Sequence, residues 1–283
     1  MARSSLAENI EKCIRGAGFE IAELLIAPIS LGSSVLNASE KRSGCALVDI
    51  GADTTTVSMY TNNILRKLVV IPLGGNNATM DIATCLNIEI EEAESLKQKY
   101  GRAFLEDYEA IQHNIVKFSH DREIGESRLC DIIEARYEEI LRNVWAQVED
   151  DSDKLTSGII LTGGGAQIRS ITEALQYITN SSKQIRIVKG LPKDITIAAG
   201  IYIPDNSKAN GILSLLLHGD QNCVLHRVKP LNPDPDDETT EDDTTEETDI
   251  TEEGTKPEVQ TKNKKKSITD FFKIIAESLK EDE

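Results

Sequence analysis

Apolar residues recur along this chain with two spacings, one typical of helices and one typical of strands. A return every three or four positions predicts helices over residues 4–16, 30–36, 80–86, 91–100, 126–148, 168–178 and 209–218. Alternating or continuous apolar runs predict strands over residues 21–27, 65–72, 158–162 and 185–188, and a hairpin over 46–60. Residues 104–116 predict no element. Strands that alternate with helices indicate an α/β fold.

The hairpin contains the first candidate site. Its first strand ends at Asp49, and the turn then passes through Gly51, Ala52, Asp53, Thr54 and Thr55. Small and hydroxyl residues in a turn can place N–H and hydroxyl groups against phosphate oxygens, and Asp49 could hold a magnesium-bound water. The alternative is an ordinary turn that only connects two strands.

Two other stretches could contact a ligand. The strand over 158–162 runs directly into Gly163, Gly164 and Gly165, where a ring or a phosphate could touch the backbone. A tight strand-to-helix turn is the alternative. Glu94 and Lys97 are three residues apart and share one face of a predicted helix. They could hydrogen-bond a ribose, or form a surface ion pair.

Composition narrows the class of protein. The hydrophobic content of 39% supports a folded core, and the 283 residues could form one large domain or two. No apolar run approaches the roughly 18 residues of a membrane span, and no signal peptide is evident. The five cysteines are scattered and predict neither a disulfide framework nor a metal site, so we expect a cytosolic protein. No basic face is evident, which argues against nucleic-acid binding.

The end of the chain has a different composition. Between residues 231 and 254 there are twelve Asp or Glu and no Lys or Arg, so most of the net charge of −17 lies there. We expect residues 227–265 to be a disordered acidic linker followed by a basic segment. Residues 266–283 predict an amphipathic helix that binds anionic membranes reversibly, or else docks on protein. The apolar side chains that share its face are Ile268, Phe271, Phe272, Ile275 and Leu279.

The order of the motifs resembles a known superfamily. The stretches that carry the likeness are residues 48–51, 71–76, 80–83, 92–101, 132–140, 158–168 and 211–219. Together they resemble the carboxy-terminal lobe of the actin, sugar-kinase and DnaK-type chaperone ATPases, and within that superfamily the FtsA family of bacterial division proteins. The resemblance implies an actin-like (ribonuclease H-like) lobe over residues 43–226, with a small inserted subdomain at about 93–148.

The resemblance also implies a cofactor, ATP with Mg²⁺. The turn from Asp49 to Thr55 would be the second phosphate loop of the cleft. Glu94 and Lys97 would contact the adenosine. The residues that would close over the adenine and ribose are Gly163, Gly164, Gly165 and Gln167.

The partners that the resemblance implies are FtsZ and the cytoplasmic membrane. The inserted subdomain would bind the acidic and apolar tail of FtsZ, with contacts from Arg128, Arg136 or Arg142, although these arginines could equally be solvent-facing charges. Such a protein would link FtsZ filaments to the inner face of the membrane at the division septum. A full-length form could also assemble into filaments.

Two departures from the family change these expectations. Gly51-Ala52-Asp53 replaces a glycine-rich run, and Asp53 would repel phosphates unless a cation bridges them or the side chain turns outward. We therefore expect at most a weak ATPase. Residues 1–42 resemble only the end of an amino-terminal lobe, so we expect a fragment or a one-lobed relative, with poor nucleotide affinity by itself. Alternative functions are a small-molecule kinase and a DnaK-like or pilus-assembly ATPase.

Overall fold

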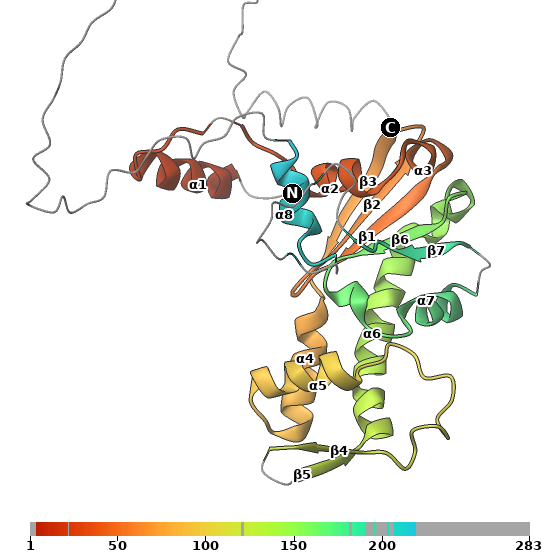
Figure 1. Ribbon diagram of the computed structural model, residues 1–283. Coiled ribbons are helices and arrows are strands. Elements are labelled where there is room, and N and C mark those ends of the chain that lie inside the picture. Colours follow the sequence, from red (N-terminus) through yellow and green to blue (C-terminus); the bar gives the residue numbers. More distant parts are fainter. Residues whose placement is uncertain are drawn as a thin grey trace, which may run out of the picture. The chain divides into compact units, whose positions relative to one another are not determined.

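The computed structural model describes residues 4–21, 23–119, 122–180, 183–190, 195, 203 and 207–218. The predicted linker and the helix over 266–283 lie outside the described residues. Within them, five strands form one mixed sheet in the order β3-β2-β1-β6-β7, and two more strands pair as a separate hairpin (Figure 1). The predicted α/β class is therefore confirmed.

The sheet combines a meander with a parallel pair. β1 (Cys45–Ile50), β2 (Thr55–Thr61) and β3 (Ile64–Ile71) are antiparallel, whereas β6 (Ile159–Thr162) and β7 (Ile185–Ile187) run parallel to β1. Side chains of β1 alternate between two apolar clusters, one on each face of the sheet. β1 is a central strand, so both faces of it are buried.

One long helix connects the sheet to a smaller group of elements. Helix α6 (Glu126–Val148) contacts β2 and β3 and also α4 (Gly75–Leu86), α5 (Ile90–Tyr100) and β5 (Arg122–Gly125). β5 pairs with β4 (Ile115–Phe118) in the small hairpin. Arg136 of α6 reaches Asp81 of α4 with two hydrogen bonds, of 2.6 and 3.0 Å. The helix therefore connects this group of elements to the sheet through β2 and β3.

The remaining helices complete the described part. They are α1 (Ser4–Gly16), α2 (Ala27–Val35), α3 (Ala38–Ser43), α7 (Ile171–Thr179) and α8 (Asn210–Leu216), with short 3-10 turns η1 (Glu149–Lys154) and η2 (Gly165–Gln167). α2 packs against α8. Among the described residues, no helix combines the length and the apolar content that crossing a membrane requires.

Most predicted elements are confirmed, and two of them with their predicted bounds, 4–16 and 126–148. The strand over 21–27 is wrong, because α2 begins at Ala27 and takes Pro28 into its first turn. Proline lacks an N–H that a first helical turn does not need, so Pro28 starts a helix there and does not end a strand. β4 and β5 were not predicted, because strands of four residues are too short to show a period.

The fully buried face of α6 gives a test of the fold. We expect Leu141→Ala to lower the free energy of unfolding by about 2–5 kcal/mol, because Leu141 is fully buried and its loss leaves a cavity. Leu68→Ala is the matched control, since Leu68 is 41% exposed on the edge strand β3 and should cost much less. Urea unfolding of the full chain measures both; equal costs would contradict this packing.

Candidate functional site

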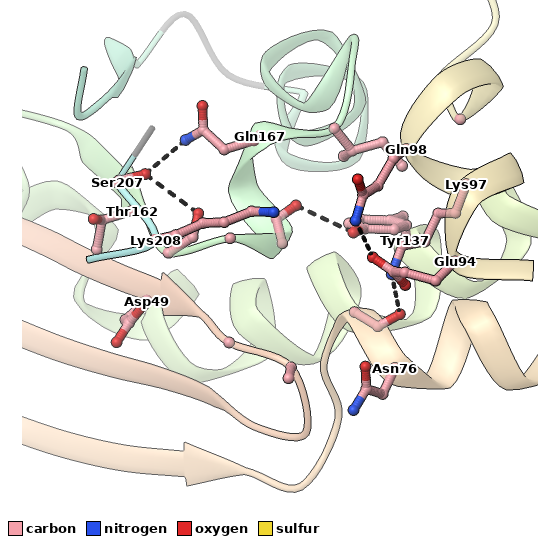
Figure 2. A pocket seen from close by; sticks show the side chains of 18 of the residues that line it. Asp49, Asn76, Glu94, Lys97, Gln98, Tyr137, Thr162, Gln167, Ser207 and Lys208 are labelled. Carbon is pink, nitrogen blue, oxygen red and sulfur yellow. Dashed lines mark hydrogen bonds and ion pairs between the residues drawn. The ribbon is translucent and has the colours of Figure 1, made fainter. Parts of the chain in front are cut away.

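A cleft of about 780 Å³ lies where the three predicted ligand-contact stretches meet. The hairpin turn contributes Asp49, Gly51 and Ala52, and α5 contributes Glu94 and Lys97 (Figure 2). The connection after β6 contributes Gly163, Gly164, Gly165 and Gln167. Pockets for small ligands commonly have volumes of roughly 300–1,000 Å³, so the cleft is large enough for a nucleotide-sized molecule.

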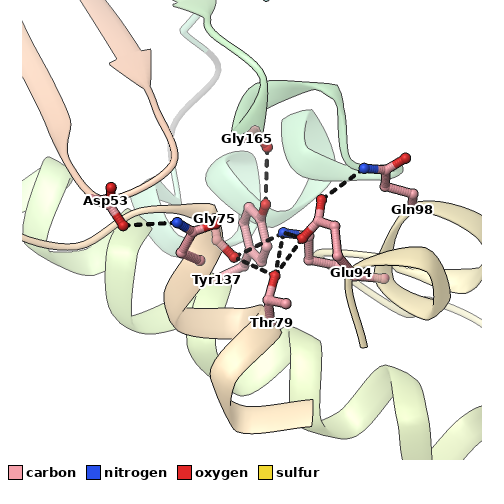
Figure 3. A network of polar contacts seen from close by, with 9 residues as sticks. Asp53, Gly75, Thr79, Glu94, Gln98, Tyr137 and Gly165 are labelled. Atoms are coloured by element: carbon pink, nitrogen blue, oxygen red, sulfur yellow. Dashed lines mark hydrogen bonds and ion pairs between the residues drawn. The ribbon is translucent and has the colours of Figure 1, made fainter. Parts of the chain in front are cut away.

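The rest of the hairpin turn does not line the cleft. Thr55 is buried, and its hydroxyl donates to the Leu73 carbonyl at 2.8 Å. Asp53 accepts a hydrogen bond of 2.8 Å from the side-chain amide of Asn76, the second residue of α4 (Figure 3). Neither these two residues nor Thr54 is among those that line the cleft. The carboxylate of Asp53 is therefore turned toward α4, as the outward alternative required.

The turn is also held to α4 through the backbone. The N–H of Gly75 donates to the Gly51 carbonyl at 3.0 Å, and the N–H of Asn76 donates to the Ala52 carbonyl at 2.7 Å. A side chain on Gly74 would place its Cβ 2.5 Å from the Ala52 carbonyl oxygen. Glycine at this position therefore lets the turn and the start of α4 lie in direct contact.

The glycine loop after β6 packs closely against the end of β1. Gly163 has a φ of +89°, and a Cβ there would lie 2.4 Å from both Asp49 Oδ1 and the Ile50 carbonyl oxygen. A Cβ on Gly165 would lie 2.5 Å from Ile50 Cγ2. Any larger residue would push the loop away from β1, so the glycines set the depth of the cleft.

Two polar side chains lie near the ends of neighbouring strands, β1 and β6, at the floor of the cleft. Asp49 and Thr162 are direct partners in the parallel pairing of β1 with β6, and both line the cleft. Burial raises the pKa of the Asp49 carboxyl. The hydroxyl of Thr162 is buried and has no hydrogen-bond partner among the described residues. A ligand that brings a cation and polar atoms could pair with the Asp49 carboxylate and with the Thr162 hydroxyl.

The Glu94–Lys97 pair is partly buried and belongs to a network (Figure 3). Lys97 Nζ lies 2.6 Å from Glu94 Oε2 and donates to the Gly75 carbonyl at 2.9 Å and to Thr79 Oγ1 at 2.7 Å. Its side chain is only 11% exposed. Burial acts to raise the pKa of Glu94, but hydrogen bonds from Lys97, Thr79 and Gln98 outweigh it and lower that pKa to about 2. The pair is thus a charged tie between α5 and the start of α4.

The cleft carries more positive than negative charge. Four basic side chains and two carboxylates line it, although the whole chain has a net charge of −17. Such a balance favours an anionic ligand. No cluster of three or more His, Cys, Asp or Glu suited to a metal ion occurs in the described ranges.

Sequence reasoning missed several lining residues. They are Leu31, Gly75, Asn76, Gln98, Lys99, Gly101, Tyr137, Ile168, Arg169, Ser207, Lys208 and Gly211. Gln98 and Ile168 directly follow the predicted residues Lys97 and Gln167, so their proximity in sequence was a usable signal. Ser207 and Lys208 follow the glycine loop by some forty residues, and no local pattern indicates them. Tyr137 donates from its hydroxyl to the Gly165 carbonyl at 3.1 Å, which joins α6 to the glycine loop.

The three arginines predicted to contact a partner lie on α6 in different settings. Arg136 is tied to Asp81 and also contacts Glu139, and Arg142 pairs with Glu138 on the surface at 2.6 Å. Arg128 is exposed. Asp81, Arg136 and Glu139 border a shallow groove of about 290 Å³ between α4 and α6. A role in partner binding stays a prediction for all three.

Comparison with known sequences decides the family. The profile of the family described as cell division protein FtsA matches residues 46–207, which is more than half of the chain. The chain belongs to the FtsA family. It is 32% identical over 185 residues to cell division protein FtsA of Bacillus subtilis, an alignment that covers 64% of this chain and 42% of that protein. With the Escherichia coli K12 protein of the same name, identity is 32% over 205 residues, covering 68% and 48%. The chain thus spans about half the length of the curated relatives it matches.

Solved structures confirm the actin-like fold. MreB5 of Spiroplasma citri bound to ADP aligns with a TM-score of 0.59 at 16% identity, over 76% of this chain and 65% of that one. A PilM–PilN type IV pilus biogenesis complex aligns with a TM-score of 0.58 at 19% identity, over 78% and 60%. At these identities the likeness concerns the fold alone. This FtsA-family chain therefore has the mixed sheet of an actin-like lobe.

The lowered pKa of Glu94 predicts a specific pH dependence of stability. Its pKa falls from 4.5 to about 2 on folding, so its contribution is complete above pH 4.5 and is lost as the pH falls toward 2. Because the side chain is 35% exposed and screened, we expect Glu94→Gln to cost only about 1 kcal/mol at pH 7.

The measurement is urea unfolding of wild type and Glu94→Gln between pH 7 and pH 3. The difference between the two proteins should shrink below pH 4.5. Glu91→Gln, an exposed change on the same helix, is the control for the general loss of a carboxylate. A difference that stays constant down to pH 3 would contradict the network.

Proposed function

We propose that this chain binds ATP with Mg²⁺ in the cleft and acts as part of an FtsA-type adaptor that tethers FtsZ filaments to the cytoplasmic membrane. One observation carries the nucleotide part. Three stretches far apart in the sequence, around Gly51, Lys97 and Gly164, line a single cleft with an excess of basic side chains. MreB5, with the same fold, has been solved bound to ADP, and this supports the choice of ligand.

The residues of the cleft suit the parts of such a ligand. The turn from Gly51 offers backbone groups to phosphates, with Asp53 already paired to Asn76 and away from them. Asp49 would hold a magnesium-bound water, since Mg²⁺ usually keeps several waters and takes one or two carboxylates plus phosphate oxygens. Glu94 and Lys97 would contact the ribose, and the loop from Gly163 to Gln167 would lie along the adenosine. Bound Mg²⁺ would neutralise phosphate charge.

The adaptor part of the proposal rests on family membership, on the predicted inserted subdomain and on the predicted helix over 266–283. The group formed by α4, α5, β4, β5 and the adjoining half of α6 would receive the FtsZ tail. Arg128 is the preferred candidate among the three predicted arginines, because it is exposed and because Arg136 and Arg142 already pair with carboxylates. The predicted helix over 266–283 would bind anionic lipid, which would place the protein at the septum on the inner face of the membrane.

Nucleotide binding is tested through Asp49. We expect wild-type protein to bind ATP more tightly with Mg²⁺ than with EDTA, and Asp49→Asn to lose most of that metal-dependent gain, roughly tenfold or more, since a charged hydrogen-bond acceptor is removed. Titration calorimetry at high protein concentration measures this. Asp151→Asn is the control, because Asp151 pairs with Lys154 on the surface. No ATP binding by wild type at millimolar concentration would refute the proposal.

Membrane binding is tested on the full chain with vesicles rich in anionic lipid. We expect co-sedimentation that Phe271→Glu abolishes, because a charge replaces a large apolar side chain within the predicted apolar face. Thr269→Glu adds the same charge outside that face and should retain most binding. Wild-type protein that stays in the supernatant would show that the helix binds protein or nothing.

A further inference from the structure

One cation of the cleft, Lys208, follows Ser207 in the chain, and local sequence patterns indicated neither residue. Ser207 is 3% exposed and precedes the start of α8. Its hydroxyl accepts a hydrogen bond of 2.6 Å from Gln167 Nε2 and donates to the Gly163 carbonyl at 3.3 Å. These two bonds fasten the backbone at Ser207 to both ends of the glycine loop. They therefore set the position from which the next side chain, Lys208, starts.

The stem of Lys208 lies along the glycine loop. A Cβ on Gly164 would come within 3.3 Å of Lys208 Cγ, 3.7 Å of its Cε and 3.9 Å of its Cδ. Figure 2 shows the side chain running across the cleft, with its amino end directed toward the side where Tyr137 and Glu94 lie. The absence of a side chain at Gly164 gives the lysine room to take this path.

The other basic groups of the cleft already have partners. Lys97 is held by Glu94, Thr79 and Gly75. Arg169 donates to the Gly101 carbonyl at 3.1 Å and to the Lys99 carbonyl at 2.7 Å. The ammonium of Lys99 lies 5.1 Å from the centre of the Tyr100 ring.

Lys208 differs from these three groups. Within the part of the chain that the structure describes, no hydrogen bond or ion pair involves its ammonium group. Since the stem is held in place and the ammonium has no partner among the described residues, the charge is available to a ligand.

We propose that Lys208 binds the phosphate oxygens of the nucleotide and so makes this cleft select phosphorylated ligands over the bare nucleoside. The inference rests on the proposed nucleotide binding and assigns its main cation. Lys97 cannot take this role without removing the cationic partner of Glu94 in a partly buried site. A lysine on a long stem suits phosphate, because it acts as a point charge that needs no fixed angle.

The test compares ATP, ADP, AMP and adenosine on the full chain, with affinities from ligand-detected NMR. We expect Lys208→Met to weaken ATP and ADP by roughly ten- to a hundredfold and adenosine by less than about twofold. Lys208→Arg should restore most of the phosphate affinity. The affinity of wild type for ATP should also fall more steeply with added salt than that of Lys208→Met.

Lys154→Met is the matched control. It removes the same charge from an exposed lysine whose partner is Asp151, so it should leave all four affinities unchanged. Thermal unfolding of each variant checks that the protein remains folded.

Two results would overturn the assignment of Lys208 and leave the proposed function standing. One is ATP affinity that Lys208→Met leaves unchanged. The other is an equal loss for adenosine and ATP, which would mean that the lysine supports the loop or contacts the base. If wild type binds none of the four compounds, the proposed function fails, and this assignment fails with it.

Discussion

The contact between the glycine loop and the end of β1 is the constraint on which the site depends. Gly163 and Gly165 lie so close to Asp49 and Ile50 that a Cβ at either position would overlap β1. The parallel pairing of β6 with β1 brings the loop there, and the positive φ of Gly163 turns the chain away at once. Because no side chain fills this space, backbone and carboxylate groups form the floor of a cleft.

The walls of the cleft depend on polar ties between elements. Lys97 joins α5 to the first turn of α4, Tyr137 joins α6 to the glycine loop, and Asn76 joins α4 to the hairpin turn. Each tie uses a side chain that also lines the cleft. The residues that hold the walls together and the residues that face a ligand are therefore largely the same, so changes to the site also affect stability.

Much of the fold was predictable because its signals are local. The apolar period of α6 continues over many turns, so both ends of the helix could be predicted. The hairpin of β1 and β2 follows from strand alternation around a turn of small residues. The prediction of short elements failed because they contain too few residues for a local signal. β4 and β5 have four residues each, and Pro28 is compatible with either the end of a strand or the first turn of a helix. Local composition cannot choose between such alternatives.

The α/β class, the family resemblance and the three stretches that line the cleft could be recognised from the sequence alone, because each depends on patterns among neighbouring residues. The tertiary structure decided how these residues are used. It turned Asp53 toward Asn76, buried Lys97 beside Thr79 and brought Lys208 over Gly164. These outcomes depend on packing between residues that are distant in the chain, and the spacing of residues along a chain carries no direct information about such contacts.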